Sequence, residues 1–459
     1  MRVKTVLASE IARLDSDVRR GGGTDDTAAL QAVLDEAKDE AVGIRLIMDG
    51  AALVSGLQVY SDTTIECLNR DCGFFQIDRS NRAIVTNGNW RDGWDNKTIL
   101  DRNISLIGGT YNQNCLHQEH NAPYDGYIFM DSGENTRWVY ALEFYGVENL
   151  TMRDMAVVDF RTFAVTVGCF RNVTIEDVWL DLPNRMYAQN QDGFHFWGPG
   201  QFLTVRNVGG KVGDDFMNLG PDEADGVSDI TDVLVDGVFL DDADQAIRLL
   251  SRDKGRLDRV TLRNITGVYR SYGFYINPWY PKPTYGNFGH IFIENVDLKA
   301  VAPNYDYRPP MLFSIGANID CLTLKNIRLH DQYDNRTAFE FGLPNYATDP
   351  DNIDTYQYPT AARPRMRNIL IEGLTVMANE GMRDSRYIAV YGAVERMIVR
   401  HADIFQAQPG DENGSLVCVH PTGSVGQLVM NDINTVGLAA VIEGRERIEK
   451  MQGDVCYDE

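Results

Sequence analysis

The chain has 459 residues, of which 44% are hydrophobic and 24% charged, and this balance excludes a wholly disordered or collagen-like protein. Its 66 acidic and 43 basic side chains give a formal net charge of −23, which disfavours nucleic acid and anionic membranes as partners. No stretch approaches the roughly 18 consecutive apolar residues of a membrane-spanning helix.

The N-terminus and the cysteines bear on the cellular compartment. The opening segment Met1–Ala8 is basic but lacks the unbroken apolar region of a signal peptide. The seven cysteines are scattered and odd in number, which favours reduced, mostly buried thiols. Only Cys67 and Cys72 are near neighbours, and we expect them to be unpaired. These features predict a cytoplasmic protein.

The first predicted element is an amphipathic helix over Thr24–Ala37, with Thr24 or Asp25 as its N-cap. Short alternating segments separated by turns follow it, and they predict strands near 45–48, 53–59 and 64–68. Residues 1–60 are therefore expected to form an N-terminal cap and the first strands of the fold.

A repeat occupies most of the remaining chain. Its unit is an Asn or similar polar residue, an alternating strand and a final aliphatic residue, as in Asn149–Met155 and Asn172–Val178. Most copies follow one another after roughly 23 to 31 residues, a period typical of a solenoid and too short for a propeller blade. Later copies end at Val208, Val238, Ile265, Val296, Ile327 and Leu374.

Each period also contains a second short strand, such as Leu142–Phe144, Phe194–Phe196 or Phe339–Phe341. Two or three strands per period predict an all-β protein, a right-handed parallel β-helix of roughly ten coils with an N-terminal capping helix. We expect one such domain over 1–459, with coils over 61–440, inserted loops near 89–140 and 342–366, and a C-terminal tail over 441–459.

Three carboxylates concentrate in two successive repeats, in the motifs Asn190–Phe196 and Gly213–Leu219. Asp192 and Asp215 occupy equivalent positions in the two motifs, and Asp214 directly precedes Asp215. Because stacked strands lie about 4.8 Å apart, this arrangement brings like charges together at an electrostatic cost that a structural role does not repay. If the coils stack in register, two outward columns form: Asp192, Asp215, Gln245 and Tyr272, and beside them His195, Asn218, Arg248 and Tyr275.

Crowded carboxylates suit the hydrolysis of a glycosidic bond, which needs one protonated and one ionised carboxyl group. A Ca²⁺ site is the rival use of the same side chains, because Ca²⁺ prefers oxygen ligands. A solvated sheet face is the plainer alternative, although such a face ordinarily carries mixed Thr, Ser, Lys and Glu.

The two motifs resemble those of glycoside hydrolase family 28, the polygalacturonase-like family of the pectin lyase-like superfamily. Asn190–Gly193 is similar to that family's Asn-Thr-Asp-Gly, and Gly213–Asp215 to its Gly-Asp-Asp. The resemblance implies a right-handed parallel β-helix and an inverting hydrolase. It also implies that Asp214 is the general acid and that Asp192 and Asp215 hold the attacking water.

The chain departs from this family in two coils. Asp244-Gln245-Ala246 stands where the family has Gly-His-Gly, and Phe274–Asn277 stands where it has the Arg-Ile-Lys that holds a galacturonate carboxylate. His195 could replace the missing histidine or be structural. Arg248 could bind a sugar hydroxyl or carboxylate, or neutralise Asp215. We therefore expect a sugar other than plain polygalacturonate, and a neutral or mixed glycan fits best.

The sequence thus predicts a glycoside hydrolase that acts on a plant-type or microbial carbohydrate, without a cofactor and without a bound metal. A Ca²⁺-dependent polysaccharide lyase and a non-catalytic, tailspike-like carbohydrate-binding β-helix are the alternatives. Trp279 and Tyr280 are candidate stacking partners for sugar rings, and His117 and His120 are interpreted as loop residues. The oligomeric state is left open. The predicted substrate-binding residues are Asn190, His195, Asn218, Gln245, Arg248, Tyr275 and Trp279.

Overall fold

The computed structural model describes residues 2–118, 140–185, 190–278, 285–303, 310–330, 337–342, 364–378, 385–406 and 411–454. The chain divides into two compact units, Met1–Asn218 and Leu219–Glu459, called unit 1 and unit 2 below. Strands dominate both units and pair in parallel, which confirms the predicted right-handed parallel β-helix.

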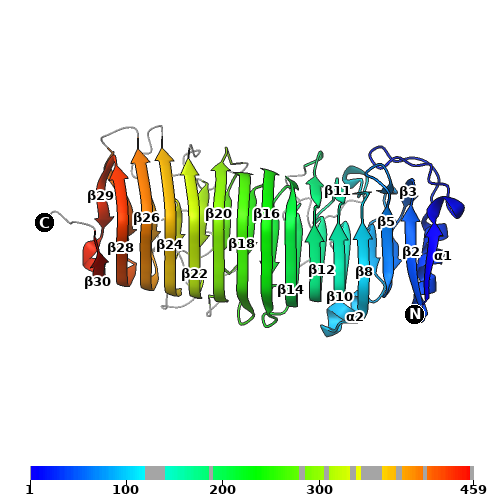
Figure 1. The fold of residues 1–459 in the computed structure, drawn as a ribbon, viewed down its shortest axis with the longest axis horizontal. Helices are drawn as coiled ribbons and strands as arrows, with labels where there is room; N and C mark the ends of the chain where they lie inside the picture. Colours follow the sequence, from blue (N-terminus) through cyan, green and yellow to red (C-terminus); the bar gives the residue numbers. More distant parts are fainter. Residues whose placement is uncertain are drawn as a thin grey trace. The chain divides into compact units, whose positions relative to one another are not determined.

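In unit 1 the longest ladder of parallel strands runs from the N-terminus to the coil that carries the acidic motifs (Figure 1). Its strands are β1 (Arg2–Leu7), β2 (Val42–Met48), β5 (Thr63–Cys67), β8 (Asp101–Ile107), β10 (Leu142–Arg153), β12 (Val165–Glu176) and β14 (Phe194–Lys211). The first four precede Asn149, so the solenoid begins before the repeat that the sequence revealed.

Two ladders of shorter strands complete the coils of unit 1. The first consists of β3 (Ala51–Val54), β6 (Gly73–Gln76), β9 (Thr110–Asn112), β11 (Ala156–Val158) and β13 (Trp179–Asp181). The second consists of β4 (Leu57–Val59), β7 (Val85–Asn87) and the opening residues of β10. Strand β15 (Asp215–Gly220) begins at the last residue of the Gly-Asp-Asp motif.

The capping helix α1 (Thr27–Leu34) is shorter than predicted and lies at the N-terminal end of the first ladder (Figure 1). Its first turn starts later because Asp25 accepts hydrogen bonds from the backbone N–H and the hydroxyl of Thr27, at 2.9 and 2.5 Å. The chain then tightens into the 3-10 helix η2 (Asp35–Lys38). The other described helices are η1 (Ala8–Glu10), α2 (Trp90–Asn96), η3 (Cys115–His117) and η5 (Arg445–Arg447).

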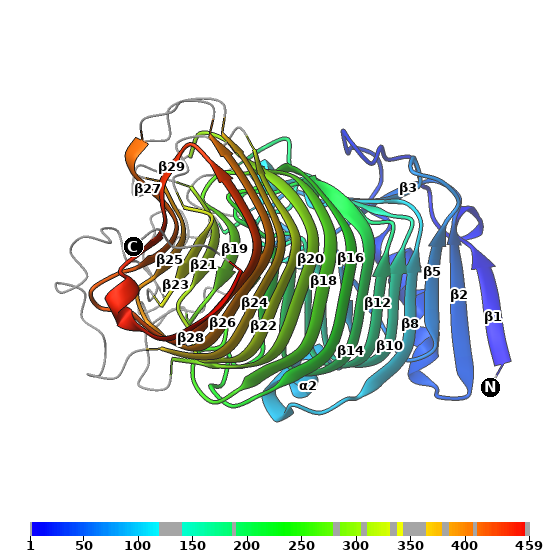
Figure 2. The same cartoon turned by 60° about the vertical axis from the view of Figure 1, so that its left-hand side comes forward.

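Unit 2 repeats the same design, with a ladder of long strands and a ladder of short ones that Figure 2 shows as separate layers. The long strands are β16 (Ile230–Asp242), β18 (Arg256–Tyr269), β20 (Asn287–Ala300), β22 (Ile319–His330), β24 (Arg365–Ala378), β26 (Ala393–Gln406), β28 (Ser424–Val436) and β30 (Ile448–Gly453). The short strands are β17 (Gln245–Leu249), β19 (Tyr272–Ile276), β21 (Met311–Ile315), β23 (Phe339–Phe341), β25 (Arg386–Val390), β27 (Asp411–Val419) and β29 (Leu438–Glu443).

Three segments are expected from the sequence to be irregular: the loops near 89–140 and 342–366 and the C-terminal tail over 441–459. The segment 89–140 contains α2, β8 and β9, so part of it belongs to the coils. Most of 342–366 lies outside the described residues. The segment 441–459 contains β30, which pairs with β28 because Ile448 packs inward opposite Val425.

The asparagine that opens each repeat has a structural explanation. Asn149 and Asn172 both adopt left-handed backbone conformations, with φ of 57° and 58°, which Asn tolerates better than most residues. The side-chain amide of Asn172 donates to that of Asn149 at 2.7 Å, and Asn149 donates to Asn103 at 2.9 Å. The repeat therefore reflects a ladder of asparagines that stacks one coil turn on the next.

Candidate active site

The two acidic motifs are held together by the backbone. The N–H of Gly193 donates to the carbonyl of Asp215 at 2.8 Å, and the N–H of Gly213 donates to the carbonyl of Gln191 at 2.8 Å. Both glycines are sterically required, because a Cβ on Gly193 would lie 2.4 Å from the carbonyl oxygen of Phe216, and one on Gly213 would lie 2.7 Å from Cβ of Gln191. The glycines of both motifs thus permit the close approach that brings the aspartates onto adjacent coils.

The three aspartates differ in their access to solvent. Asp192 is 2% exposed and Asp215 is 4% exposed, whereas Asp214 is half-buried. Phe194 and Met217, which alternate with the polar positions of the two strands, are fully buried, as the predicted register requires. Asp214 is therefore the carboxyl group of the three that solvent reaches most readily.

Asp192 and His195 form a buried pair. Nδ1 of His195 lies 2.9 Å from Oδ2 of Asp192, and both side chains are 3% exposed. The imidazole stacks on Phe163, with ring centroids 4.4 Å apart and planes 6° apart, and it also contacts Trp197 at 4.5 Å. With its proton on Nδ1, the imidazole of His195 donates a hydrogen bond to the carboxylate of Asp192.

His195 belongs to a row of outward-facing side chains that the parallel register defines. His195 pairs with Thr166, Thr166 with Glu143, and Glu143 with Thr86. Glu143 is buried and stands two strands from His195, roughly 10 Å away at the usual strand spacing. Glu143 is not among the predicted site residues, although it is the polar centre of the same kind of apolar–polar–apolar triplet as His195.

An aromatic cluster adjoins the buried pair. Trp197 contacts Tyr145, and both contact Trp94 of helix α2, with ring centroids 4.8 to 5.9 Å apart. Trp94 is half-buried, and the ammonium of Lys97 lies 3.5 Å from the centroid of its ring. Helix α2 thus packs, through Trp94, on the same tryptophan, Trp197, that contacts His195.

In unit 2 the parallel register aligns one pair from each predicted column, Gln245 with Tyr272 and Arg248 with Tyr275. Tyr272 stacks on Tyr275 with centroids 4.2 Å apart, and the guanidinium carbon of Arg248 lies 4.8 Å from the Tyr275 ring. Because Tyr275 is 4% exposed, its ring supports Arg248, which is 9% exposed, rather than presenting an open face to a sugar.

The remaining predicted positions divide into three kinds. Asn190 and Gln245 are half-buried, and Asn218 is buried. Trp279 and Tyr280 lie outside the described residues, as does His120. His117, interpreted from the sequence as a loop residue, is the last residue of the 3-10 helix η3; it is exposed, with Nδ1 3.5 Å from a carboxylate oxygen of Asp78.

The short-strand ladder of unit 2 contains a second buried glutamate, Glu340, which is also absent from the predicted site residues. Tyr275 pairs with Ser314 and Ser314 with Glu340, whose carboxylate accepts a hydrogen bond from the Ser314 hydroxyl at 3.4 Å. Like Glu143, Glu340 is the centre of an apolar–polar–apolar triplet and is buried.

Within the described ranges no three His, Cys, Asp or Glu side chains are grouped so that they could hold a metal ion. In the same part of the chain no helix has the length and apolar character needed to span a membrane.

Comparison with known proteins places the chain by fold. No protein-family model and no curated protein matches it. The structure is similar to the family 28 exopolygalacturonase of Yersinia enterocolitica, with a TM-score of 0.50 and 14% identity over 98% of this chain and 78% of the enzyme. It is also similar to a tailspike protein mutant of E. coli bacteriophage HK620 in complex with a pentasaccharide, with a TM-score of 0.55 and 11% identity over 94% of this chain and 75% of the tailspike. The N-terminal fragment of bacteriophage phi29 gene product 12 gives a TM-score of 0.55 and 12% identity over 96% and 72% of the two chains. At these identities the similarity concerns the fold.

Proposed function

We propose that this protein is a glycoside hydrolase that cleaves a glycosidic bond of an oligo- or polysaccharide with inversion, using Asp192, Asp214 and Asp215. The observation that carries the proposal is the buried pair of Asp192 and His195, with Nδ1 and Oδ2 2.9 Å apart, on the coil next to Asp214 and Asp215. A fold similar to that of a family 28 exopolygalacturonase supports it.

The different burial of the aspartates suits different roles. Asp214 is half-buried, so it is the group that can reach a glycosidic oxygen and donate a proton to the leaving alcohol. Asp192, which Nδ1 of His195 contacts at 2.9 Å, holds a water molecule together with Asp215 and accepts its proton as the water oxygen attacks the anomeric carbon. One water is consumed, and the leaving oxygen gains the proton from Asp214.

The substrate is proposed to be a neutral or mixed glycan. No Arg-Ile-Lys clamp for a galacturonate carboxylate is present in the coil of Phe274–Asn277. In unit 2, Arg248 stands over Tyr275 with its guanidinium oriented by that ring, and this side chain is proposed to bind a sugar hydroxyl or carboxylate.

The test is a screen of the purified protein against aryl glycosides and pectic and neutral oligosaccharides, with the anomeric configuration of the first product followed by proton NMR. Asp214→Asn is expected to lower kcat by about 10²-fold or more. The control Asp181→Asn removes a carboxylate from an exposed position of β13 and is expected to leave kcat unchanged.

Three results would contradict the proposal. A retained anomeric configuration would exclude inversion. An unsaturated product that absorbs in the ultraviolet, with activity lost to a chelator, would identify a lyase. Binding of oligosaccharides without any cleavage would identify a non-catalytic carbohydrate-binding β-helix.

A further inference from the structure

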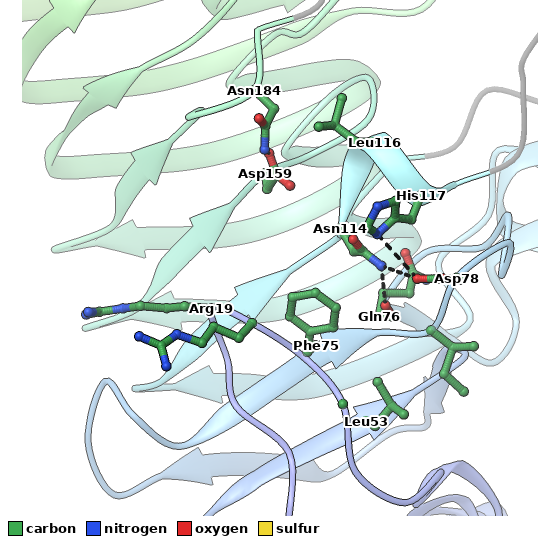
Figure 3. Close-up of a pocket in the computed structure, with 13 residues that line it drawn as sticks. Arg19, Leu53, Phe75, Gln76, Asp78, Asn114, Leu116, His117, Asp159 and Asn184 are labelled. Atoms are coloured by element: carbon green, nitrogen blue, oxygen red, sulfur yellow. Dashed lines mark hydrogen bonds and ion pairs between the residues drawn. The ribbon is translucent and has the colours of Figure 1, made fainter.

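Unit 1 contains a cavity of about 620 Å³, and none of its lining residues belongs to the two acidic motifs. Its volume is within the roughly 300–1,000 Å³ of small-molecule sites. The loop that precedes α1 forms one wall and contributes Arg19, Arg20 and Gly22. Figure 3 shows Arg19 on one side of Phe75 and the group of Asn114, His117 and Asp78 on the other.

The arginine wall is held in place by the backbone of its own loop. Asp17 accepts hydrogen bonds from the N–H groups of Arg19 and Arg20, at 2.7 and 3.0 Å, and the carbonyl of Val18 accepts one from the side chain of Asn112 at 3.0 Å. The bond from Arg19 is the main reason that the pKa of Asp17 lies below its usual range. The loop also packs on Phe75, since a Cβ on Gly21 would lie 2.4 Å from that ring.

The other walls are polar, and their carboxylates already have partners. Asp78 accepts a hydrogen bond from Asn114 at 2.8 Å and lies 3.5 Å from Nδ1 of His117. Asp159 accepts a hydrogen bond from Asn184 at 2.8 Å.

The charge of the arginines, by contrast, is uncompensated by direct contacts. In the part of the chain that the structure describes, neither the Arg19 nor the Arg20 guanidinium makes a hydrogen bond or an ion pair.

We propose that this cavity is a second carbohydrate-binding site, separate from the catalytic aspartates, that takes an acidic sugar. The carboxylate of the sugar binds between Arg19 and Arg20, because guanidinium groups recognise carboxylates by paired charge-assisted hydrogen bonds. Its hydroxyl groups bind the amides and carboxylates of the opposite walls, and the apolar face of its ring rests on the exposed side chain of Leu116. A cavity of this size exceeds what an inorganic anion fills, which favours a sugar over free phosphate.

This proposal does not depend on the catalytic one, and calorimetry separates the two. The ligands are digalacturonate, a glucuronate-containing disaccharide and sialyllactose, with neutral galactobiose and inorganic phosphate as comparisons. The full-length Asp214→Asn variant serves as the starting protein, so that cleavage does not consume the ligand. We expect at least one acidic sugar to bind, with galactobiose at least about tenfold weaker.

Arg19→Ala and Arg20→Ala are each expected to weaken that binding about tenfold or more, since each removes a hydrogen bond to a charged group. Arg396→Ala, an exposed arginine of β26 in unit 2, changes the net charge equally and is expected to have no effect. Both cavity arginines are exposed, so the variants should fold, and circular dichroism checks this.

Failure of every acidic sugar to bind would overturn the proposal. So would binding that survives the double Arg19→Ala, Arg20→Ala substitution, because the sugar would then occupy another site. Phosphate binding as tight as that of the best acidic sugar would show a general anion site instead.

Discussion

The asparagine ladder of unit 2 allows a stability change to be worked out in detail. Asn295 donates to the side chain of Asn264 at 3.0 Å and accepts from Asn326 at 3.0 Å, and its φ is 56°. Position 373, opposite Asn326 on the next coil, is a glycine with φ of 73°. The left-handed conformation is thus required at this turn even where the amide ladder ends.

Asn295→Ala removes two exposed hydrogen bonds, worth together about 1 kcal/mol, and forces alanine into the left-handed region at a further cost of about 1–2 kcal/mol. The expected loss of unfolding free energy is therefore about 2–3 kcal/mol. Asn295→Gly loses the same hydrogen bonds but adopts the conformation freely, so that only about 0.5 kcal/mol of chain entropy is added and the loss is about 1.5 kcal/mol.

Equilibrium urea unfolding of the full chain measures both values, and hydrogen exchange of β20 and β22 locates the effect. Asn434→Ala serves as a matched control, because Asn434 has an ordinary backbone conformation and makes one long hydrogen bond, at 3.4 Å to Asp403. We expect it to cost less than about 0.5 kcal/mol. A glycine variant as unstable as the alanine variant, or a control as unstable as either, would refute the reasoning.

Three further predictions concern the site and acid stability. His195→Leu should lower kcat about tenfold or more, because it removes the donor to Asp192. His195→Asn keeps an N–H near the position of Nδ1 and should retain part of the kcat that the leucine variant loses. Equal loss of kcat in both variants would contradict a positioning role for His195. Polygalacturonate should be a poorer substrate than neutral oligosaccharides, and whatever cleavage of it occurs should fall in Arg248→Ala; efficient cleavage that survives the substitution would refute this interpretation. Burial acts to raise the pKa of Asp258, but hydrogen bonds from His290 and the charge of Arg256 outweigh burial, so the pKa in the folded state is lowered. The ionised carboxylate therefore stabilises the fold above about pH 4, and this stabilisation is lost as the pH falls through the folded-state pKa. The melting temperature of Asp258→Asn should therefore lie below that of the parent at about pH 6 and approach it at about pH 3, and a constant gap would contradict the assignment.

The sequence by itself determined the coil architecture and the surface on which the polar residues gather. Period and alternation are local properties, and a parallel β-helix repeats one local rule along the chain. For this reason the burial of Phe194 and Met217 and the pairing of Arg248 with Tyr275 followed from spacing alone. The glycines of the Asp-Gly and Gly-Asp-Asp motifs could likewise be read as points of close contact between coils.

Only the tertiary structure decided which of these side chains touch. The pair of Asp192 and His195 depends on how the turn before β14 bends, and the stacking of Phe163 on His195 depends on the register between two coils. Neither the bend of this turn nor the register between the coils is encoded in the period of the repeat. The same holds for Tyr275, whose ring stacks on Tyr272 rather than lying open to a sugar. Regular alternation would put two residues three positions apart on opposite faces of a strand, so the spacing of the repeat does not predict this contact.

The cavity beside α1 shows this limit most clearly. Arg19 precedes the capping helix, whereas Asn184 comes more than a hundred residues later, and no sequence pattern links them. They line one cavity because parallel coils bring equivalent turns to the same side of the solenoid and because the loop before α1 packs on Phe75. Long-range packing of this kind is settled by the three-dimensional fit of side chains, which the one-dimensional pattern does not contain.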